Sequence, residues 1–148
     1  MNVPPNLADA LRQWIRKAEH DLEAANRIMV IEQDCPFDAV CFHCQQACEK
    51  YVKCLLTFLG IEAPRTHNLR LLFALIPADL GFPVPVDILA ELNPYAVEVR
   101  YGDDWIEPRL ADAHRALQTS AQVRTFVRDR MPPEVLVRNP VSPNENAR

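Results

Sequence analysis

Residues 36–60 read PFDAVCFHCQQACEKYVKCLLTFLG, and this stretch decides the fold. Its apolar residues recur at steps of three and four, which places them on one face of a helix. They are Phe37, Val40, Cys41, Cys44, Cys48, Tyr51, Leu55 and Phe58. Proline is tolerated in the first turn of a helix and glycine commonly follows the last one, so Pro36 and Gly60 bracket this predicted helix.

Four more segments carry the helical periodicity. It predicts long helices over residues 6–32 and 108–131, and short helices over residues 69–76 and 86–92. The 13 prolines lie mainly at the ends of these segments, and 3 glycines are too few for a hairpin-rich β fold or a glycine-rich phosphate loop. We therefore predict an all-α protein, an antiparallel four- to five-helix bundle.

The chain has 148 residues, which suits a single domain. We expect the bundle to span residues 1–131. Residues 132–148 mix Pro, Asn and Ser with few apolar groups, so we expect a mobile C-terminal tail there. Residues 95–107 alternate weakly like a strand. Because a lone strand would have no partner, we interpret them as a helix end followed by a loop.

The net charge of −4 excludes a strongly basic nucleic-acid-binding protein as a bulk property, although a local basic patch stays possible. No apolar run approaches the ~18 residues of a membrane span, and the N-terminus lacks the pattern of a secretion signal. An odd number of cysteines, five, fits a reducing compartment. We expect a cytoplasmic protein with no membrane association.

Three of the cysteines, Cys41, Cys44 and Cys48, share one helix face, and the C-x2-C spacing raises the question of zinc. A structural zinc site needs four tetrahedral ligands, usually from two chain segments, and the chain has no second C-x2-C pair. His43 lies well off the face of the thiols. We therefore interpret these thiols as small core residues, and expect neither a metal nor a cofactor.

A polar stripe runs along the same helix, on the side away from the thiols. It consists of His43, Gln46, Lys50 and Lys53, with Gln45 and Glu49 beside it. One interpretation is a solvated face on which Glu49 and Lys53 form an i,i+4 ion pair. The other is a lip that binds an anion or lines a cleft.

The string FHCQQACEK at residues 42–50 resembles the FHAQQAAEK-type signature of HEPN domains. Further pieces follow in the same order as in that family. Gly60 and the PRTHNL string at residues 64–69 resemble its "G…PRTHDL" connector, and residues 92–93 and 100–101 resemble its "LN…RY" segment. The resemblance covers residues 11–130, and at Cys44 and Cys48 the family commonly has alanine.

The resemblance implies a small helical bundle that is usually a homodimer. Many HEPN proteins act with a minimal nucleotidyltransferase as a toxin–antitoxin pair. Several branches are metal-independent endoribonucleases with an R-x4–6-H motif near the start of the last long helix. There His would act as acid or base on the ribose and Arg would hold the phosphate.

The family comparison places the motif arginine at Arg100, but no histidine follows it at the required spacing, and three acidic residues do. Arg109 and His114 match R-x4-H literally, although such a match is expected by chance in a chain with this many arginines. On a regular helix their side chains diverge by about 140°. We keep Arg100, Arg109 and His114 as catalytic candidates.

The connector and the LN…RY segment add further candidates. Thr66 is a candidate N-cap for the helix that follows it. His67 lies in the same connector, where loop residues often carry function, although its ordinary role would be a local hydrogen bond. Tyr101 could be an exposed hydroxyl that a partner enzyme modifies, since a motif tyrosine is adenylylated in some HEPN proteins. The candidates for binding a nucleotide or RNA are His43, Gln46, Lys50, Lys53, Arg65, His67, Arg100 and Tyr101.

Three functional hypotheses follow. The first is a dimeric HEPN binding module that acts with a nucleotidyltransferase and has little or no catalytic activity. The second is an RNA-cleaving toxin that uses Arg109 and His114, or a site built from Arg100, Lys50 and His67. The third is a nucleotide-binding module with a cleft lined by Lys50, Lys53 and Arg100.

Overall fold

The computed structural model describes residues 4–96 and 105–137, and every regular element in these ranges is helical. The all-α prediction is therefore confirmed. The α-helices are α1 (Pro5–Met29), α2 (Phe37–Phe58), α3 (Leu69–Ala74), α4 (Val86–Ala90), α5 (Leu110–Arg130) and α6 (Pro133–Leu136). Two short 3-10 helices, Ala78–Leu80 and Asn93–Tyr95, lie in the segments after α3 and α4.

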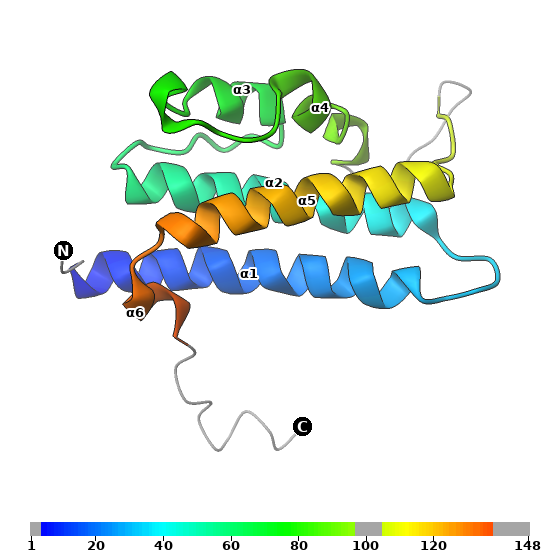
Figure 1. Ribbon diagram of the computed structural model, residues 1–148, viewed down its shortest axis with the longest axis horizontal. Coiled ribbons are helices and arrows are strands. Elements are labelled where there is room, and N and C mark those ends of the chain that lie inside the picture. Colours follow the sequence, from blue (N-terminus) through cyan, green and yellow to red (C-terminus); the bar gives the residue numbers. More distant parts are fainter. Residues whose placement is uncertain (1–3, 97–104, 138–148) are drawn as a thin grey trace, which may run out of the picture.

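The three long helices form the bundle, and α2 is its central member (Figure 1). Helix α1 runs antiparallel to α2 and packs along its length, while α5 packs against another side of α2. Helices α3 and α4 form a separate layer above α2. The chain crosses the bundle through this layer before α5 begins, so α5 runs in the same direction as α2. Contacts between the Cys48 and Ser120 side chains and between Cys54 and Met131 follow that parallel order.

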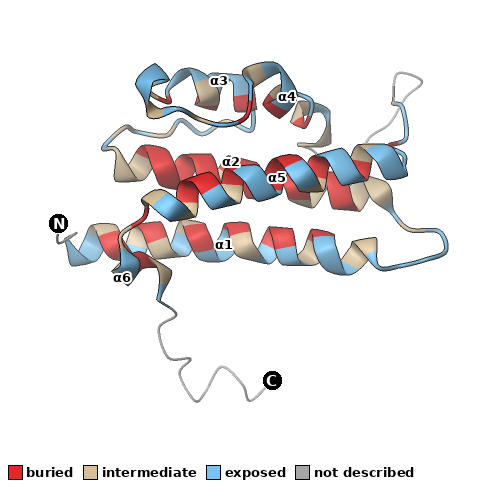
Figure 2. Ribbon diagram, viewed as in Figure 1, coloured by how far each residue is buried: buried red, intermediate tan, exposed pale blue. Residues whose placement is uncertain are grey.

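The core surrounds α2 on almost all sides, and buried residues concentrate where the long helices meet (Figure 2). Tyr51 and Leu55 are fully buried, as the apolar stripe predicts. The interpretation of the opposite stripe as a solvated face is wrong, because Glu49 and Lys53 are also buried, at 4% and 9% exposure. Helix α1 and the connector before α3 cover that side of α2.

Several predicted helix boundaries differ from those in the structure. Helix α1 ends at Met29 rather than near residue 32. Helix α5 begins at Leu110 rather than at Pro108, because the backbone N–H of Arg109 donates to Asp112 Oδ2 at 2.8 Å and fixes the N-cap.

The segment expected to form a tail from residue 132 contains α6. Val135 is buried against the bundle, and Arg12 of α1 donates two hydrogen bonds, of 3.0 and 2.8 Å, to the carbonyl oxygen of Glu134. These contacts order residues 133–136, which composition alone assigned to the tail. Residues 138–148 lie outside the described part of the chain. Within the described ranges, no helix is long and apolar enough to cross a bilayer.

Candidate functional site

Asp21 of α1 binds two polar side chains of α2. Its carboxylate accepts His43 Nδ1 at 2.9 Å and Lys50 Nζ at 2.5 Å. His43 and Lys50 are seven residues apart, so they lie on the same face of α2, and antiparallel packing brings Asp21 to that face. Asp21 is 9% exposed. Burying this carboxylate is tolerable because two cationic or hydrogen-bonding partners compensate it.

Glu49 of α2 holds a second pair of residues in the same way. Its carboxylate accepts Lys53 Nζ at 2.8 Å and His67 Nδ1 at 3.0 Å. The predicted Glu49–Lys53 ion pair is therefore confirmed, although it is buried rather than solvated. Lys53 Nζ also lies 5.9 Å from the ring centroid of Trp14 on α1, within the range of a cation–π contact.

Two glutamines extend the Glu49 cluster. Gln45 Nε2 donates to the backbone oxygen of His67 at 3.0 Å and lies 3.3 Å from Glu49 Oε2. Gln46 Nε2 donates to Gln45 Oε1 at 2.6 Å. The Asp21 cluster and this extended Glu49 cluster both lie along α2. Together we call them the α2 network: Asp21, His43, Gln45, Gln46, Glu49, Lys50, Lys53 and His67.

The connector that carries His67 is anchored at several points. Thr66 Oγ1 accepts the backbone N–H of Asn68 at 3.1 Å, and the Asn68 side chain caps α3 by accepting the N–H of Arg70 at 3.0 Å. Asn68, not Thr66, is therefore the N-cap residue of α3. Asn93 Oδ1 accepts the N–H of Leu69 at 2.9 Å. The His67 side chain is 68% exposed, so a fixed backbone presents this ring to solvent.

The structure divides five of the predicted binding residues between two clusters. His43 and Lys50 bind Asp21, whereas Gln46, Lys53 and His67 contact Glu49. Arg65 lies exposed in the connector. Arg100 and Tyr101 fall outside the described residues.

Sequence reasoning missed Asp21, the acceptor that unites His43 and Lys50. The available signal was a carboxylate between Ala18 and Leu22 on the buried stripe of α1. A carboxylate beside an apolar face indicates a partner across the interface.

The cysteines of α2 pack in the core, as predicted. Cys41, Cys44, Cys48 and Cys54 are fully buried free thiols. Burial raises the pKa of each to about 12, so all four remain protonated at neutral pH. Ser120 lies between two of them, 3.5 Å from Cys48 Sγ, and donates to the Ala116 carbonyl at 2.8 Å.

The literal R-x4-H match lies at the start of α5, where both Arg109 and His114 are exposed. Arg109 is the N-cap residue, and His114 is one turn into the helix. Carboxylates hold His43 and His67, whereas among the described residues no carboxylate binds His114. The sequence match therefore does not coincide with an oriented arginine–histidine pair within one chain.

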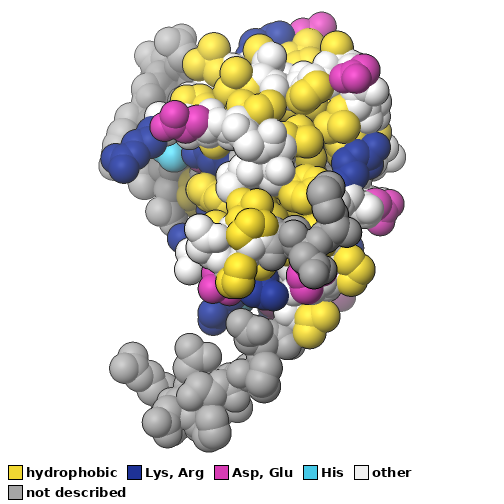
Figure 3. Space-filling model, turned by 90° about the vertical axis from the view of Figure 1, so that its left-hand side faces the viewer, with side chains coloured by type: hydrophobic (Ala, Val, Ile, Leu, Met, Phe, Trp, Pro, Cys, Tyr) yellow, Lys and Arg dark blue, Asp and Glu magenta, His cyan; other side chains and the backbone are white. Residues whose placement is uncertain are grey.

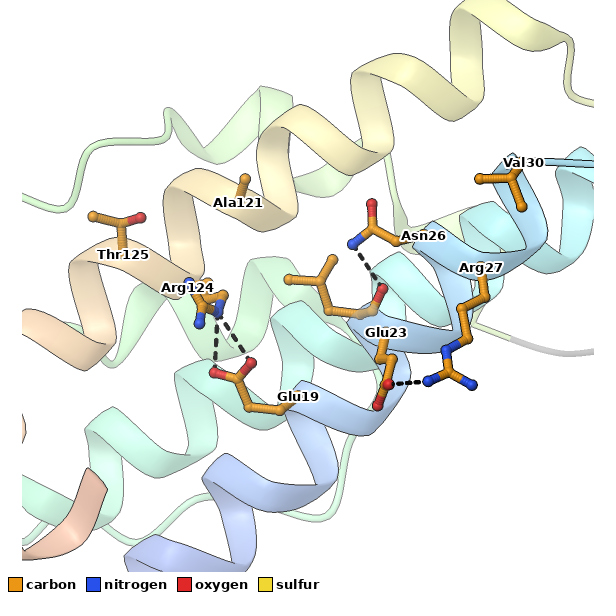
Figure 4. Close-up of a pocket in the computed structure, with 9 residues that line it drawn as sticks. Glu19, Glu23, Asn26, Arg27, Val30, Ala121, Arg124 and Thr125 are labelled. Atoms are coloured by element: carbon orange, nitrogen blue, oxygen red, sulfur yellow. Dashed lines mark hydrogen bonds and ion pairs between the residues drawn. The ribbon is translucent and has the colours of Figure 1, made fainter. Parts of the chain in front are cut away.

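A groove of about 610 Å³ lies between α1 and α5, apart from the α2 network (Figure 4). Leu22, Val30 and Ala121 supply its apolar surface. At one end Glu19 of α1 accepts Arg124 Nε at 3.0 and 3.1 Å and Arg128 Nη1 at 2.9 Å, which ties α1 to α5.

Tyr51 of α2 lies fully buried beneath this end of the groove. Burial and the nearby carboxylate of Glu19 raise the pKa of its phenol above the ordinary value. The hydroxyl therefore stays protonated under all ordinary conditions, and the ion pairs above it shield it from solvent.

Exposed apolar side chains lie at the end of α1 and around the start of α5. Val30 is 76% exposed and Leu110 51%, with Ile31 and Ile106 beside them in the sequence. The end of α1 and the start of α5 lie at the same end of the molecule (Figure 1). Other hydrophobic side chains reach the surface at the opposite end, with charged groups spaced around them (Figure 3). Contiguous exposed apolar surface marks interaction sites more often than isolated residues do.

Comparison with known proteins gives a family model and two solved structures. The HEPN domain model matches residues 11–130. TT1696 from Thermus thermophilus is 26% identical with a TM-score of 0.66, and the match covers 82% of this chain and 98% of that one. ST0689, an archaeal HEPN homologue, is 29% identical with a TM-score of 0.60, covering 80% and 95%. No curated protein gives a significant match.

Proposed function

The chain belongs to the HEPN domain family, and from this premise we propose a homodimeric binding module that acts with a minimal nucleotidyltransferase and does not itself cleave RNA. One observation carries the proposal: the polar side chains of the α2 network are bound by two carboxylates of the protein itself. The Asp21 carboxylate binds His43 and Lys50, and the Glu49 carboxylate binds Lys53 and His67. Side chains so committed support the shape of the bundle rather than a cationic site for RNA.

The start of α5 supports the same conclusion. An RNA-cleaving site would need an oriented histidine near an arginine that holds the phosphate. His114 is exposed and lacks the carboxylate support that His43 and His67 have among the described residues. A nucleotide would likewise have to displace Asp21 or Glu49 to reach Lys50 or Lys53, which disfavours the nucleotide-binding alternative.

For the dimer, we propose an interface formed by the end of α1 and the start of α5, because Val30 and Leu110 are exposed there. Light scattering after size exclusion should give about twice the chain mass of 16.9 kDa. Leu110→Glu should give monomers, while the matched variant Leu71→Glu, at 55% exposure on α3, should leave the dimer intact. A wild-type monomer at micromolar concentration contradicts the dimer. Equal effects of the two variants contradict the choice of surface.

For the partner, the test is co-expression with a minimal nucleotidyltransferase encoded beside this chain. The two proteins should co-elute from size exclusion as one complex. The absence of such a neighbouring gene, or separate elution of the two proteins, contradicts the pairing but leaves the dimer measurement valid.

A further inference from the structure

We infer that His67 is a phosphoryl-accepting residue, a modification site whose ring Nε2 attacks an electrophilic phosphorus atom. The inference goes beyond the proposed binding function and does not depend on it. It rests on the way that a buried carboxylate supports an exposed ring.

The ring is held in one orientation by Glu49. His67 Nδ1 lies 3.1 Å from Glu49 Oε1 and 3.0 Å from Oε2. An ionised carboxylate can only accept hydrogen bonds, and Glu49 forms an ion pair with Lys53 Nζ at 2.8 Å. Nδ1 therefore carries the hydrogen, and the lone pair of the neutral ring resides on Nε2.

The two partners differ sharply in exposure. The Glu49 side chain is 5% exposed, whereas the His67 side chain is 68% exposed. A protruding ring can enter the active site of another protein or meet a small donor in solution. The buried carboxylate orients the ring through Nδ1 and leaves the outer nitrogen facing away from it, as carboxylates do for histidines that bind metals.

The backbone of His67 is fixed as well as its ring. Gln45 of α2 donates to its carbonyl oxygen at 3.0 Å, and the next residue, Asn68, caps α3. The arrangement fixes the position at which a nucleophile meets its electrophile.

The other histidines supply internal comparisons. His20 and His114 are exposed, but neither is bound by a carboxylate within the described residues. His43 has a carboxylate, Asp21, but its side chain is only 28% exposed and it shares that carboxylate with Lys50. Only His67 combines carboxylate support with high exposure among these four.

With phosphoramidate as the donor, the step balances. The Nε2 lone pair forms a bond to phosphorus, the bond between phosphorus and the donor nitrogen breaks, and ammonia leaves with the electron pair of that bond. The zwitterionic donor already carries the proton that ammonia retains. The ring keeps its Nδ1 hydrogen and becomes a cation, which the Glu49 carboxylate stabilises, and no group is oxidised or reduced.

The experiment treats the purified full chain with potassium phosphoramidate and maps the modified histidines over time by mass spectrometry under alkaline conditions. Phosphorus-31 NMR identifies the substituted ring nitrogen. We expect modification at Nε2 of His67 to be about tenfold faster than at His20 or His114 in the same molecule. His67→Asn should remove the fast phase and leave the slow modification of the other two.

Two further results decide the matter. Glu49→Gln should lower the rate at His67 to that of His20. Should this variant fail to fold, the ratio of rates within the wild-type chain remains a complete test. Equal rates at His67, His20 and His114, or attachment at Nδ1 of His67, would overturn the inference. A purely structural role for the Glu49–His67 contact predicts such equal rates.

Discussion

The α2 network and the ion cluster of the α1–α5 groove use the same arrangement in different surroundings. In each a carboxylate joins two cationic or hydrogen-bonding side chains: Glu49 takes Lys53 and His67, and Glu19 takes Arg124 and Arg128. The Glu49 side chain is 5% exposed, however, and that of Glu19 is 30% exposed. Burial should therefore make Glu49 the more important of the two for stability.

The second difference is chemical. Arginines remain charged at every ordinary pH, and both are committed to holding α1 against α5. A histidine bound through Nδ1 keeps its second ring nitrogen uncommitted. The arginine cluster is thus suited to fixing two helices, whereas the histidine cluster both fixes a connector and presents a reactive atom.

The largest expected effect comes from removing the charge of Glu49. Glu49→Gln leaves Lys53 buried without a counter-charge, so the free energy of unfolding should fall by about 3–5 kcal/mol. Chemical denaturation measures this change. Glu23→Gln is the matched control, because the Glu23–Arg27 pair is 54% and 79% exposed and should contribute under about 1 kcal/mol. A similar decrease in the free energy of unfolding for both variants would contradict the claim that burial makes the Glu49 ion pair the more important one.

Alkaline titration tests the buried face of α2 that supports both regions. The ordinary pKa of a thiol is 9.0 here, and burial raises that of Cys48 to about 12. As the pH rises, the thiol of the unfolded chain therefore loses its proton before the thiol of the folded chain does. The contribution of the protonated thiol to the stability of the folded state is complete below pH 9 and is lost as the pH rises toward 12. Each such thiol should lower the free energy of unfolding by about 1.4 kcal/mol per pH unit in that window.

The control for this prediction is Cys48→Ala, measured over the same pH range. The cavity that this substitution creates lowers the free energy of unfolding at pH 7. Above pH 9, however, the free energy of unfolding should fall less steeply with pH than in the wild type, by the contribution of one thiol. An unchanged slope would show that Cys48 is not shielded from solvent in the way that the packing implies.

A smaller loss is expected at the groove. Glu19→Gln should cost about 1 kcal/mol, because the carboxylate and Arg124, at 30% and 39% exposure, are partly solvated. High salt screens exposed pairs more than buried ones, so the difference between wild type and Glu19→Gln should shrink in 1 M salt. The difference for Glu49→Gln should persist. Denaturation at low and high salt checks both, and the reverse order would contradict the comparison.

The smallest expected effect on stability is at His67. His67→Asn should change the free energy of unfolding by no more than about 1 kcal/mol, since the ring is 68% exposed and Lys53 still neutralises Glu49. A loss as large as that of Glu49→Gln would mean that His67 is mainly a structural partner.

The helices could be predicted from the sequence because their signals are local. The apolar stripe of α2 and the spacing of α1 and α5 depend only on neighbouring residues, and they gave the elements to within a few positions. The Glu49–Lys53 pair was also predictable, since its members are one turn apart. Its burial was not, because the cover comes from α1 and from the connector before α3.

The contacts that unite distant segments could not be predicted in this way. Asp21 meets His43 across 22 residues and Lys50 across 29, and only the antiparallel packing of α1 and α2 brings them together. The helix α6 was missed for a similar reason. Its composition is that of a tail, and the contacts that hold the helix come from distant residues. Arg12 of α1 donates to the Glu134 carbonyl, and Val135 is buried in the core.

The central claim, a HEPN module that binds rather than cleaves, is tested most directly by incubating the purified chain with labelled RNA beside Arg100→Ala, Arg109→Ala and His114→Ala. We predict that the wild-type protein produces no cleavage above that of buffer alone, and that the three variants are indistinguishable from it. Cleavage by the wild type that is lost in any one of these variants would contradict the account and favour the ribonuclease.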